Sequence, residues 1–284
     1  MPEQFAEYQG LNQFGPAYRL LLENDPHPPG SVDRVLMLSM IRVCEQTAGY
    51  LYGPFTDARV PYSPGTRPVL ESVATEIRRT DPKDEAFVEG VARCASRLSD
   101  IAPQGLDELK FGGSEEELLV RGSNWPTDVA RVAAALFQVS GLPARIVYLA
   151  DTDRPYSMHA IVEVRREDRW GAVDPLANVV YRWEDGLPAK VWDLMRNPTL
   201  LVAHYREGSL SCTKPSQFRA AAVANYPLGE IDRFNYSTGG VTDYYRPILE
   251  MADQGWPGGL RWLHAEDALL SVPVEALPTP ARPA

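Results

Sequence analysis

Apolar residues recur at helical spacing through much of the first hundred residues of the chain. In the stretch 31–53 they predict one helix with Ser31 as its N-cap, and its broad apolar face comprises Val32, Val35, Leu36, Ile41, Val43 and Cys44. Two further helices are predicted over roughly 67–79 and 84–99, and Asp84 is expected to cap the second. The first part of the chain is therefore expected to be mostly helical.

Two helices with clear start and stop signals follow. Ser114 with a glutamate three residues later forms a capping box, which opens a short helix. The next helix is rich in alanine and valine over 129–136, and Gly141 followed by Pro143 ends it. Because this helix is apolar on most sides, it is predicted to be buried at the centre of the fold.

Strand patterns follow the central helix. Three candidates have the sequences ARIVYLA, HAIVEVRR and RWGAVDP, and a short turn of sequence EDR joins the last two as a hairpin. Residues 177–181 are expected to add a further short strand, whereas 188–265 is expected to hold loops and helices rich in tyrosine and tryptophan. The predicted fold class is α+β: helices, then a small antiparallel sheet against a central helix, then more helices.

Composition and charge narrow the class of protein. The 284 residues include 38 acidic and 28 basic side chains, which gives a formal net charge of −10. Such an acidic chain is not suited to coating nucleic acid or an anionic membrane. The sequence contains no run of about 18 apolar residues. Its first residues also lack the pattern of a signal peptide, so we expect a cytoplasmic protein with no membrane span.

Three cysteines, Cys44, Cys94 and Cys212, are odd in number and far apart. This pattern is typical of free thiols in a reducing cytoplasm. Neither a CxxC nor an HExxH motif is present, so a standard zinc site is not expected. We expect neither a metal nor a cofactor, and the expected partner is a small-molecule or peptide substrate.

The order of helix, strand, His-bearing strand and Asp-bearing strand indicates a family. The stretches GLPARIVYL, MHAIVEV and RWGAVDPLANVVY, all within 113–181, resemble the transglutaminase-like (papain-related) core. The resemblance implies that a catalytic cysteine opens the central helix and that His159 and Asp174 are its catalytic partners. These two residues lie 15 positions apart, as neighbouring antiparallel strands require.

The chain departs from this family at the nucleophile. Counting back from GLPAR places the family's cysteine at Pro126, which has neither a thiol nor a backbone N–H. Thiol chemistry at this position is therefore impossible, because the nucleophile and an oxyanion donor are both missing. Proline is well tolerated in the first turn of a helix, so the fold is expected to survive the change.

Two roles remain open for His159 and Asp174. In the first, His159 is a general acid or base and Asp174 fixes the tautomer of its ring, which suits elimination, isomerisation, cyclisation or activation of water. In the second, the pair is a structural relic. A third alternative is a substitute nucleophile, with Ser123, Thr127 or one of the cysteines in place of the missing thiol.

Further site candidates come from the start of the central helix and from the strands. Trp125 is either a pocket wall or a core anchor. Alternation places Glu163 on the same strand face as His159, where a carboxylate in solvent is favoured over one in the cleft. A metal held by His159, Asp174, Glu163 and a histidine from a distant part of the chain is an alternative. The pocket candidates are Ser123, Asn124, Trp125, Thr127, Tyr156 and Glu163.

The same patterns divide the chain into regions. Residues 1–111 form a mostly helical N-terminal region, and 112–182 form the transglutaminase-like core. Residues 183–270 are expected to be a helical and loop extension of the same domain. The last stretch, 271–284, is rich in proline and is expected to be disordered.

Three functions are compatible with these features. The first is an enzyme that uses the His–Asp pair for proton transfer on a small amino-acid- or peptide-derived substrate, for example in a tailoring step of specialised metabolism. The second is a non-catalytic module that binds a ligand or a protein. The third is an acyltransferase or amide hydrolase with a substitute nucleophile.

Overall fold

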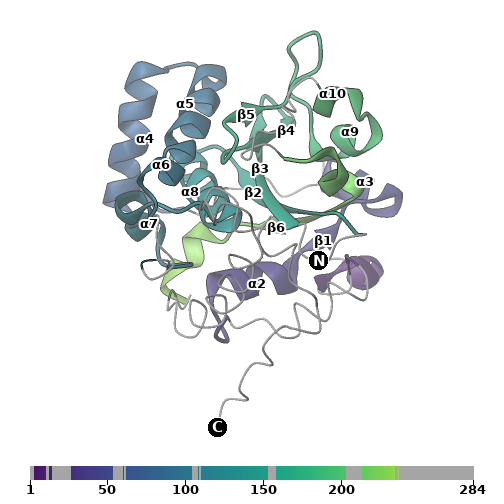
Figure 1. The fold of residues 1–284 in the computed structure, drawn as a ribbon, viewed down its shortest axis with the longest axis horizontal. Coiled ribbons are helices and arrows are strands. Elements are labelled where there is room, and N and C mark those ends of the chain that lie inside the picture. The colour runs from purple at the N-terminus through teal and green to yellow at the C-terminus, as the bar shows by residue number, and fades with distance from the viewer. Residues whose placement is uncertain are drawn as a thin grey trace, which may run out of the picture.

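Figure 1 shows the computed structural model of the chain. The structure describes residues 3–10, 13–14, 27–53, 60, 62–103, 108, 110–152, 158–202, 213–233 and 236. Three of the features predicted above lie outside these residues: Tyr156, Cys212 and the tail 271–284.

A six-stranded antiparallel sheet forms the centre of the described part of the molecule (Figure 1). Its strand order is β1-β6-β2-β3-β4-β5. The strands are β1 Ile41–Arg42, β2 Ala144–Ala150, β3 Met158–Arg166, β4 Arg169–Asp174, β5 Val179–Val180 and β6 Ala220–Asn225. Every residue of β2 is buried, because elements pack on both faces of the sheet.

Helices cover both faces of the sheet, as the left and right sides of Figure 1 show. One core cluster joins the sheet to α2 Val32–Ser39, α4 Pro68–Thr80, α5 Asp84–Ser96, α6 Leu98–Ile101, α7 Glu115–Arg121 and α8 Pro126–Val139. A second cluster joins the other face to α3 Glu45–Leu51, α9 Val191–Arg196, α10 Thr199–Val202 and the 3-10 helix η4 Pro215–Arg219. Two further 3-10 helices are η1 Glu3–Tyr8 and η5 Leu228–Arg233. The predicted α+β class is confirmed.

Helix α8 is the central buried helix that the sequence predicts. Of its 14 residues, 12 are buried, so little of its surface faces solvent. The chain leaves the helix through Gly141, whose φ of +81° suits glycine, and then enters β2. The capping box at Ser114, which opens α7, is also present as predicted.

The position of α8 along the sheet is fixed at its C-terminal end. The side-chain amide of Gln138 donates to the carbonyl of Ala144 at 2.8 Å and to that of Tyr226 at 3.1 Å. Because α8 packs along β2 and β3 and is about 21 Å long, its first residue lies toward the other end of these strands. At that end β3 begins and β4 terminates.

A buried charged cluster holds α7 and α8 together. The Arg131 guanidinium lies 3.3 Å from the Glu115 carboxylate and 3.2 Å from that of Asp128, and it donates to the carbonyl of Gly113 at 2.7 Å. The hydroxyl of Tyr226 donates to Glu115 as well. A buried guanidinium with several acidic partners keeps its charge, so this cluster fixes the first turns of α8.

The prediction of a single helix over 31–53 is wrong. The structure has α2, then strand β1, then α3, and Met40 is already extended with a ψ of 143°. Ile41 and Val43 are buried while Arg42 between them is exposed, which is the period of a strand. The N–H of Val43 donates to the carbonyl of Ala221 at 2.8 Å, so pairing with β6 overrides the helical pattern.

Two other details differ from the prediction. Asp84 is the first residue of α5 rather than its cap, since Lys83 occupies the N-cap, and Asp84 pairs with Arg78 at 2.8 Å instead. The extension 183–270, expected to hold helices and loops, supplies strand β6 between β1 and β2. Its alanine-rich sequence fits there because small side chains let helices approach a sheet that is covered on both faces.

Candidate active site

The structure brings His159 and Asp174 together. His159 is the second residue of β3 and Asp174 is the last residue of β4. These strands pair in antiparallel register, and the Nε2 atom of His159 lies 3.0 Å from Oδ2 of Asp174. Both side chains are buried, at 5% and 0% exposure, so water does not screen the pair strongly.

Further hydrogen bonds anchor Asp174. The hydroxyl of Thr213 donates to its Oδ2 atom, and the backbone N–H of Ala177 donates to Oδ1 at 3.0 Å. Burial by itself raises the pKa of this carboxyl, but the charge of His159 and the hydrogen bonds outweigh burial and hold the pKa of Asp174 below its ordinary value. Asp174 is therefore an ionised acceptor that holds the imidazole ring in one orientation.

The lowered pKa of Asp174 predicts a pH-dependent loss of stability in the variant Asp174→Asn. A carboxyl whose pKa falls on folding stabilises the folded state above its unfolded pKa of about 3.9, and this contribution disappears as the pH drops through the folded value. We expect Asp174→Asn to lower the free energy of unfolding by about 1.5–3 kcal/mol at neutral pH. Chemical denaturation from pH 7 to pH 3 measures the difference in unfolding free energy between the variant and the wild type. We expect this difference to narrow below about pH 4. A constant difference across this range would contradict the assignment.

The pair lies on the sheet face opposite α8. Alternation along the strands places His159 with Ile161, and Asp174 with Ala172. Ile161 and Ala172 belong to the core cluster of α3, α9 and η4, whereas Ala160 belongs to that of α8. The start of α8 and the pair thus share one end of the sheet but project from different faces.

Pro126 is the first residue of α8, and it is buried. Trp125 precedes it as the N-cap and makes no side-chain capping bond. The half-buried Trp125 ring packs edge-on against Phe111, with the ring centroids 4.7 Å apart. The helix start therefore presents a saturated ring and an indole, neither of which is a nucleophile.

Ser123 is tied into the structure by its own hydroxyl. Its Oγ atom donates to Asp128 at 2.9 Å and accepts from the backbone N–H of Trp125 at 3.1 Å. Burial raises the pKa of Asp128, and the hydrogen bond from Ser123 opposes that rise. Ser123 and Asn124 are buried, whereas Thr127 is half-buried. Ser123 does not cap α8, and its partner is a carboxyl in place of the imidazole that activates a serine in hydrolases.

The two cysteines within the described residues are free thiols. Cys94 lies in α5, where burial raises the pKa of its thiol and so reduces the thiolate that a nucleophile needs. Cys44 precedes α3 as its N-cap, and its Sγ atom lies 3.5 Å from Oγ1 of Thr47.

The interpretation of Glu163 as a carboxylate in solvent is wrong. Its side chain is fully buried, and its Oε2 atom accepts from Arg145 at 2.9 Å and 2.6 Å. Its Oε1 atom accepts from the Tyr52 hydroxyl at 3.0 Å and from the N–H of Val191 at 2.7 Å. Because Arg145 faces Glu163 directly in the β2–β3 register, the two form a cross-strand ion pair outside the His159–Asp174 site.

Within the described ranges, no group of three or more His, Cys, Asp or Glu side chains lies together in a way that would hold a metal ion. No helix there is long and apolar enough to cross a membrane.

A comparison with protein families agrees with this geometry. Residues 71–175, from α4 to the residue after β4, match the sequence model of the transglutaminase-like superfamily. The match agrees with the resemblance that the motifs indicate, and the matched stretch contains Pro126, His159 and Asp174. Neither a search of curated proteins nor a search of solved structures gives a match to the chain.

Thr213 is a site residue that the sequence analysis missed. It comes from a segment far along the chain, just before η4, and reaches Asp174 only because β6 returns to the middle of the sheet. Because the sequence analysis does not predict β6, no pattern near Thr213 indicates that this residue lies at the site.

Proposed function

We propose that the protein is an enzyme that uses His159 as a general acid or base without a cysteine nucleophile. The observation that carries the proposal is the buried His159–Asp174 contact of 3.0 Å. The carboxylate holds Nε2 of the ring and so fixes the orientation in which the imidazole can exchange a proton with a substrate.

The anchoring of Asp174 supports this role. An acid–base histidine needs a fixed orientation, and the N–H of Ala177 and the hydroxyl of Thr213 hold the carboxylate that orients it. The charge on Asp174 also stabilises the imidazolium that forms when His159 takes a proton. The reactions that fit are elimination, isomerisation, cyclisation and activation of water, because none of them needs a nucleophile from the protein.

The side chains near the start of α8 support chemistry without a thiol. Pro126 offers no nucleophilic atom, and the Ser123 hydroxyl is bound to a carboxyl. Cys94 has a raised thiol pKa. We extend the proposal, on the family resemblance alone, to a small amino-acid- or peptide-derived substrate and to a tailoring step in specialised metabolism.

A panel of dipeptides, amino-acid amides and N-acyl amino acids tests the proposal. Each compound is incubated with the native protein and with heat-denatured protein, and both mixtures are compared by liquid chromatography and mass spectrometry. We expect the native protein to convert at least one compound and to carry no covalent adduct when its denatured mass is measured. An acyl adduct would favour the substitute-nucleophile alternative instead. Its peptide map would distinguish Ser123, Thr127 and the three cysteines, among which Cys212 directly precedes Thr213.

A non-catalytic binding module is the second candidate function. A cavity on another part of the sheet favours it, since that cavity is lined by aromatic and charged side chains. A module of this kind would convert none of the panel, and His159→Ala would change at most its ligand affinity. Comparison of native and denatured masses identifies any ligand that the purified protein retains.

A further inference from the structure

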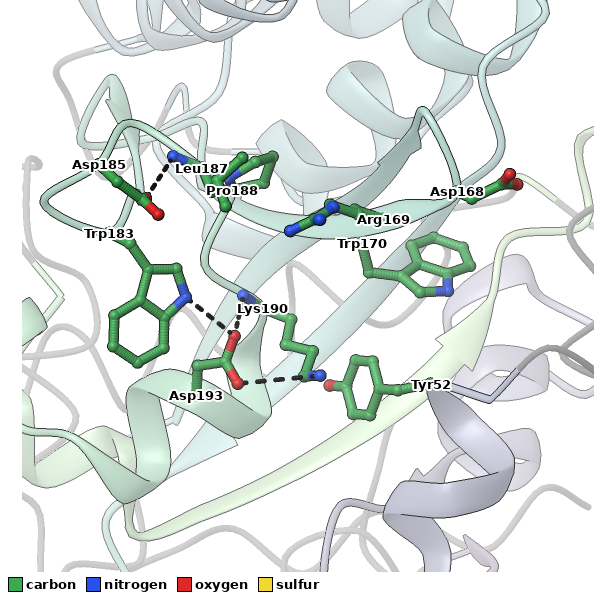
Figure 2. A pocket seen from close by; sticks show the side chains of 10 residues that line it. All are labelled: Tyr52, Asp168, Arg169, Trp170, Trp183, Asp185, Leu187, Pro188, Lys190 and Asp193. Carbon is green, nitrogen blue, oxygen red and sulfur yellow. Dashed lines mark hydrogen bonds and ion pairs between the residues drawn. The ribbon is translucent and has the colours of Figure 1, made fainter.

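A cavity of about 340 Å³ lies beside the β3–β4 hairpin (Figure 2). This volume is at the lower end of the range for small-molecule pockets. Its wall is formed by Tyr52 after α3, by the first two residues of β4, by a loop that precedes α9, and by the N-cap of α9. The residues used below are Tyr52, Arg169, Trp170, Trp183, Pro188 and Lys190.

The cavity is separate from the His159–Asp174 pair. Arg169 starts β4 and Asp174 ends it, so about 17 Å of strand separates them. Any ligand in the cavity therefore occupies a second site rather than an extension of the first.

Ordered backbone builds the wall that carries Trp183. The N–H of Trp183 donates to the carbonyl of Leu187 at 2.9 Å, and Gly186 between them has a φ of +84° that suits glycine. This loop packs closely on β4, because a Cβ atom at Gly171 would lie only 2.7 Å from Cβ of Pro188. Trp183 is thus held in place although its side chain remains 37% exposed.

Cations already lie over the other two aromatic rings. The guanidinium of Arg145 lies 3.9 Å from the ring centroid of Trp170 and 4.8 Å from that of Tyr52. The Lys190 ammonium lies 5.1 Å from the Tyr52 centroid. A cationic ligand would be repelled by these groups, so the aromatic side chains do not form a cage for a cation.

The acidic side chains around the cavity have partners. Asp193 accepts from the N–H of Lys190 at 3.2 Å and from the indole N–H of Trp183 at 3.4 Å. Asp185 accepts from the N–H of Leu187 at 3.0 Å. Asp168 pairs with Arg165 at 3.1 Å, and Figure 2 shows it pointing away from the other side chains.

The basic side chains are less constrained. Arg169 has no acidic partner within the described ranges, and its guanidinium extends toward Pro188 in Figure 2. The Lys190 ammonium forms an ion pair with Asp193 at 3.8 Å, which Figure 2 shows, and this distance is too long for a hydrogen bond. The side-chain donors that this cavity can offer a ligand are therefore the guanidinium of Arg169 and the ammonium of Lys190.

We propose that the cavity binds a small carboxylate ligand with a flat ring, with the ring against Trp183 and the carboxylate on Arg169 and Lys190. An exposed indole held by the backbone offers a stacking surface at small entropic cost. A guanidinium and an ammonium supply charge-assisted hydrogen bonds to the carboxylate.

Calorimetric titration with a matched pair of probes tests the proposal. Indole-3-carboxylate carries the ring and the charge, and indole-3-carboxamide carries the ring alone. We expect the carboxylate to bind about tenfold more tightly than the amide, because only the carboxylate makes charged hydrogen bonds. Equal affinity for the two probes, or no measurable binding of either, would overturn the proposal.

Single variants locate the bound probe. Arg169→Gln, Lys190→Gln and Trp183→Ala are each expected to weaken binding of the carboxylate by about fivefold or more, as removal of one strong contact does. Arg196→Gln is the charge-matched control, since this exposed arginine lies on α9 outside the cavity wall. His159→Gln is expected to leave the affinity unchanged. Loss of binding in His159→Gln, with no effect of the three wall variants, would place the probe at the other site and contradict the proposal.

Discussion

The variant His159→Gln is expected to convert substrate about 10²–10⁴ times more slowly than the wild-type protein. Glutamine keeps a side-chain N–H that can donate to the buried Asp174, but it has no nitrogen that titrates near neutral pH. Proton transfer therefore stops while the hydrogen bond that holds the strand ends together can persist. Initial rates on any compound that the wild-type protein converts give the comparison directly.

Two controls separate a loss of chemistry from a loss of structure. Circular dichroism and the melting temperature of His159→Gln should remain close to those of the wild type. His27→Gln is the matched control, because His27 also lies beside a carboxylate, at 3.5 Å from Asp33, but belongs to neither of the strands that carry the pair. We expect His27→Gln to retain full activity. A fully active His159→Gln variant would show that this histidine is only structural.

The variant Glu163→Gln is expected to lose about 3–5 kcal/mol of unfolding free energy. It leaves the buried Arg145 guanidinium without its counter-charge, although Arg145 still donates to the carbonyl of Leu51 at 2.8 Å. The N–H of Val191 and the Tyr52 hydroxyl also meet a weaker acceptor. Urea denaturation measures the change.

A double variant shows that the loss comes from the unpaired charge. Arg145→Met combined with Glu163→Leu replaces the pair with apolar side chains of similar size, and we expect it to be more stable than Glu163→Gln alone. Both variants should retain the His159–Asp174 contact, since that pair lies farther along β3 and β4. A double variant less stable than the single one would mean that the loss does not come from the unpaired charge of Arg145.

Much of the core follows from the sequence. The strands β2, β3 and β4 have clear patterns, and the glycine and proline after α8 mark its end. The spacing of His159 and Asp174 predicts neighbouring antiparallel strands, and the structure places their side chains 3.0 Å apart. The turn between β3 and β4 is also local, because Glu167 and Asp168 both adopt positive φ angles, as a tight hairpin requires.

The features that the sequence did not predict depend on contacts between residues that are far apart along the chain. Strands β1 and β6 pair with each other across most of the chain, and neither has a pattern that predicts a strand without its partner. Thr213 reaches Asp174 only through β6. The Arg145–Glu163 pair, in contrast, could have been predicted from the sequence. The two opposite charges lie in adjacent predicted strands, and the antiparallel register places them opposite each other.

Catalysis without a thiol is the central claim, and a cysteine-free protein tests it most directly. The variant combines Cys44→Ser, Cys94→Ala and Cys212→Ser, and serine suits the N-cap position that Cys44 occupies. Its turnover is measured beside that of the wild type, after circular dichroism has established that it is folded. We predict that the folded variant retains the wild-type rate. A rate reduced by several orders of magnitude in the folded variant, restored when one cysteine is returned, would show that a thiol carries the reaction and would contradict the account.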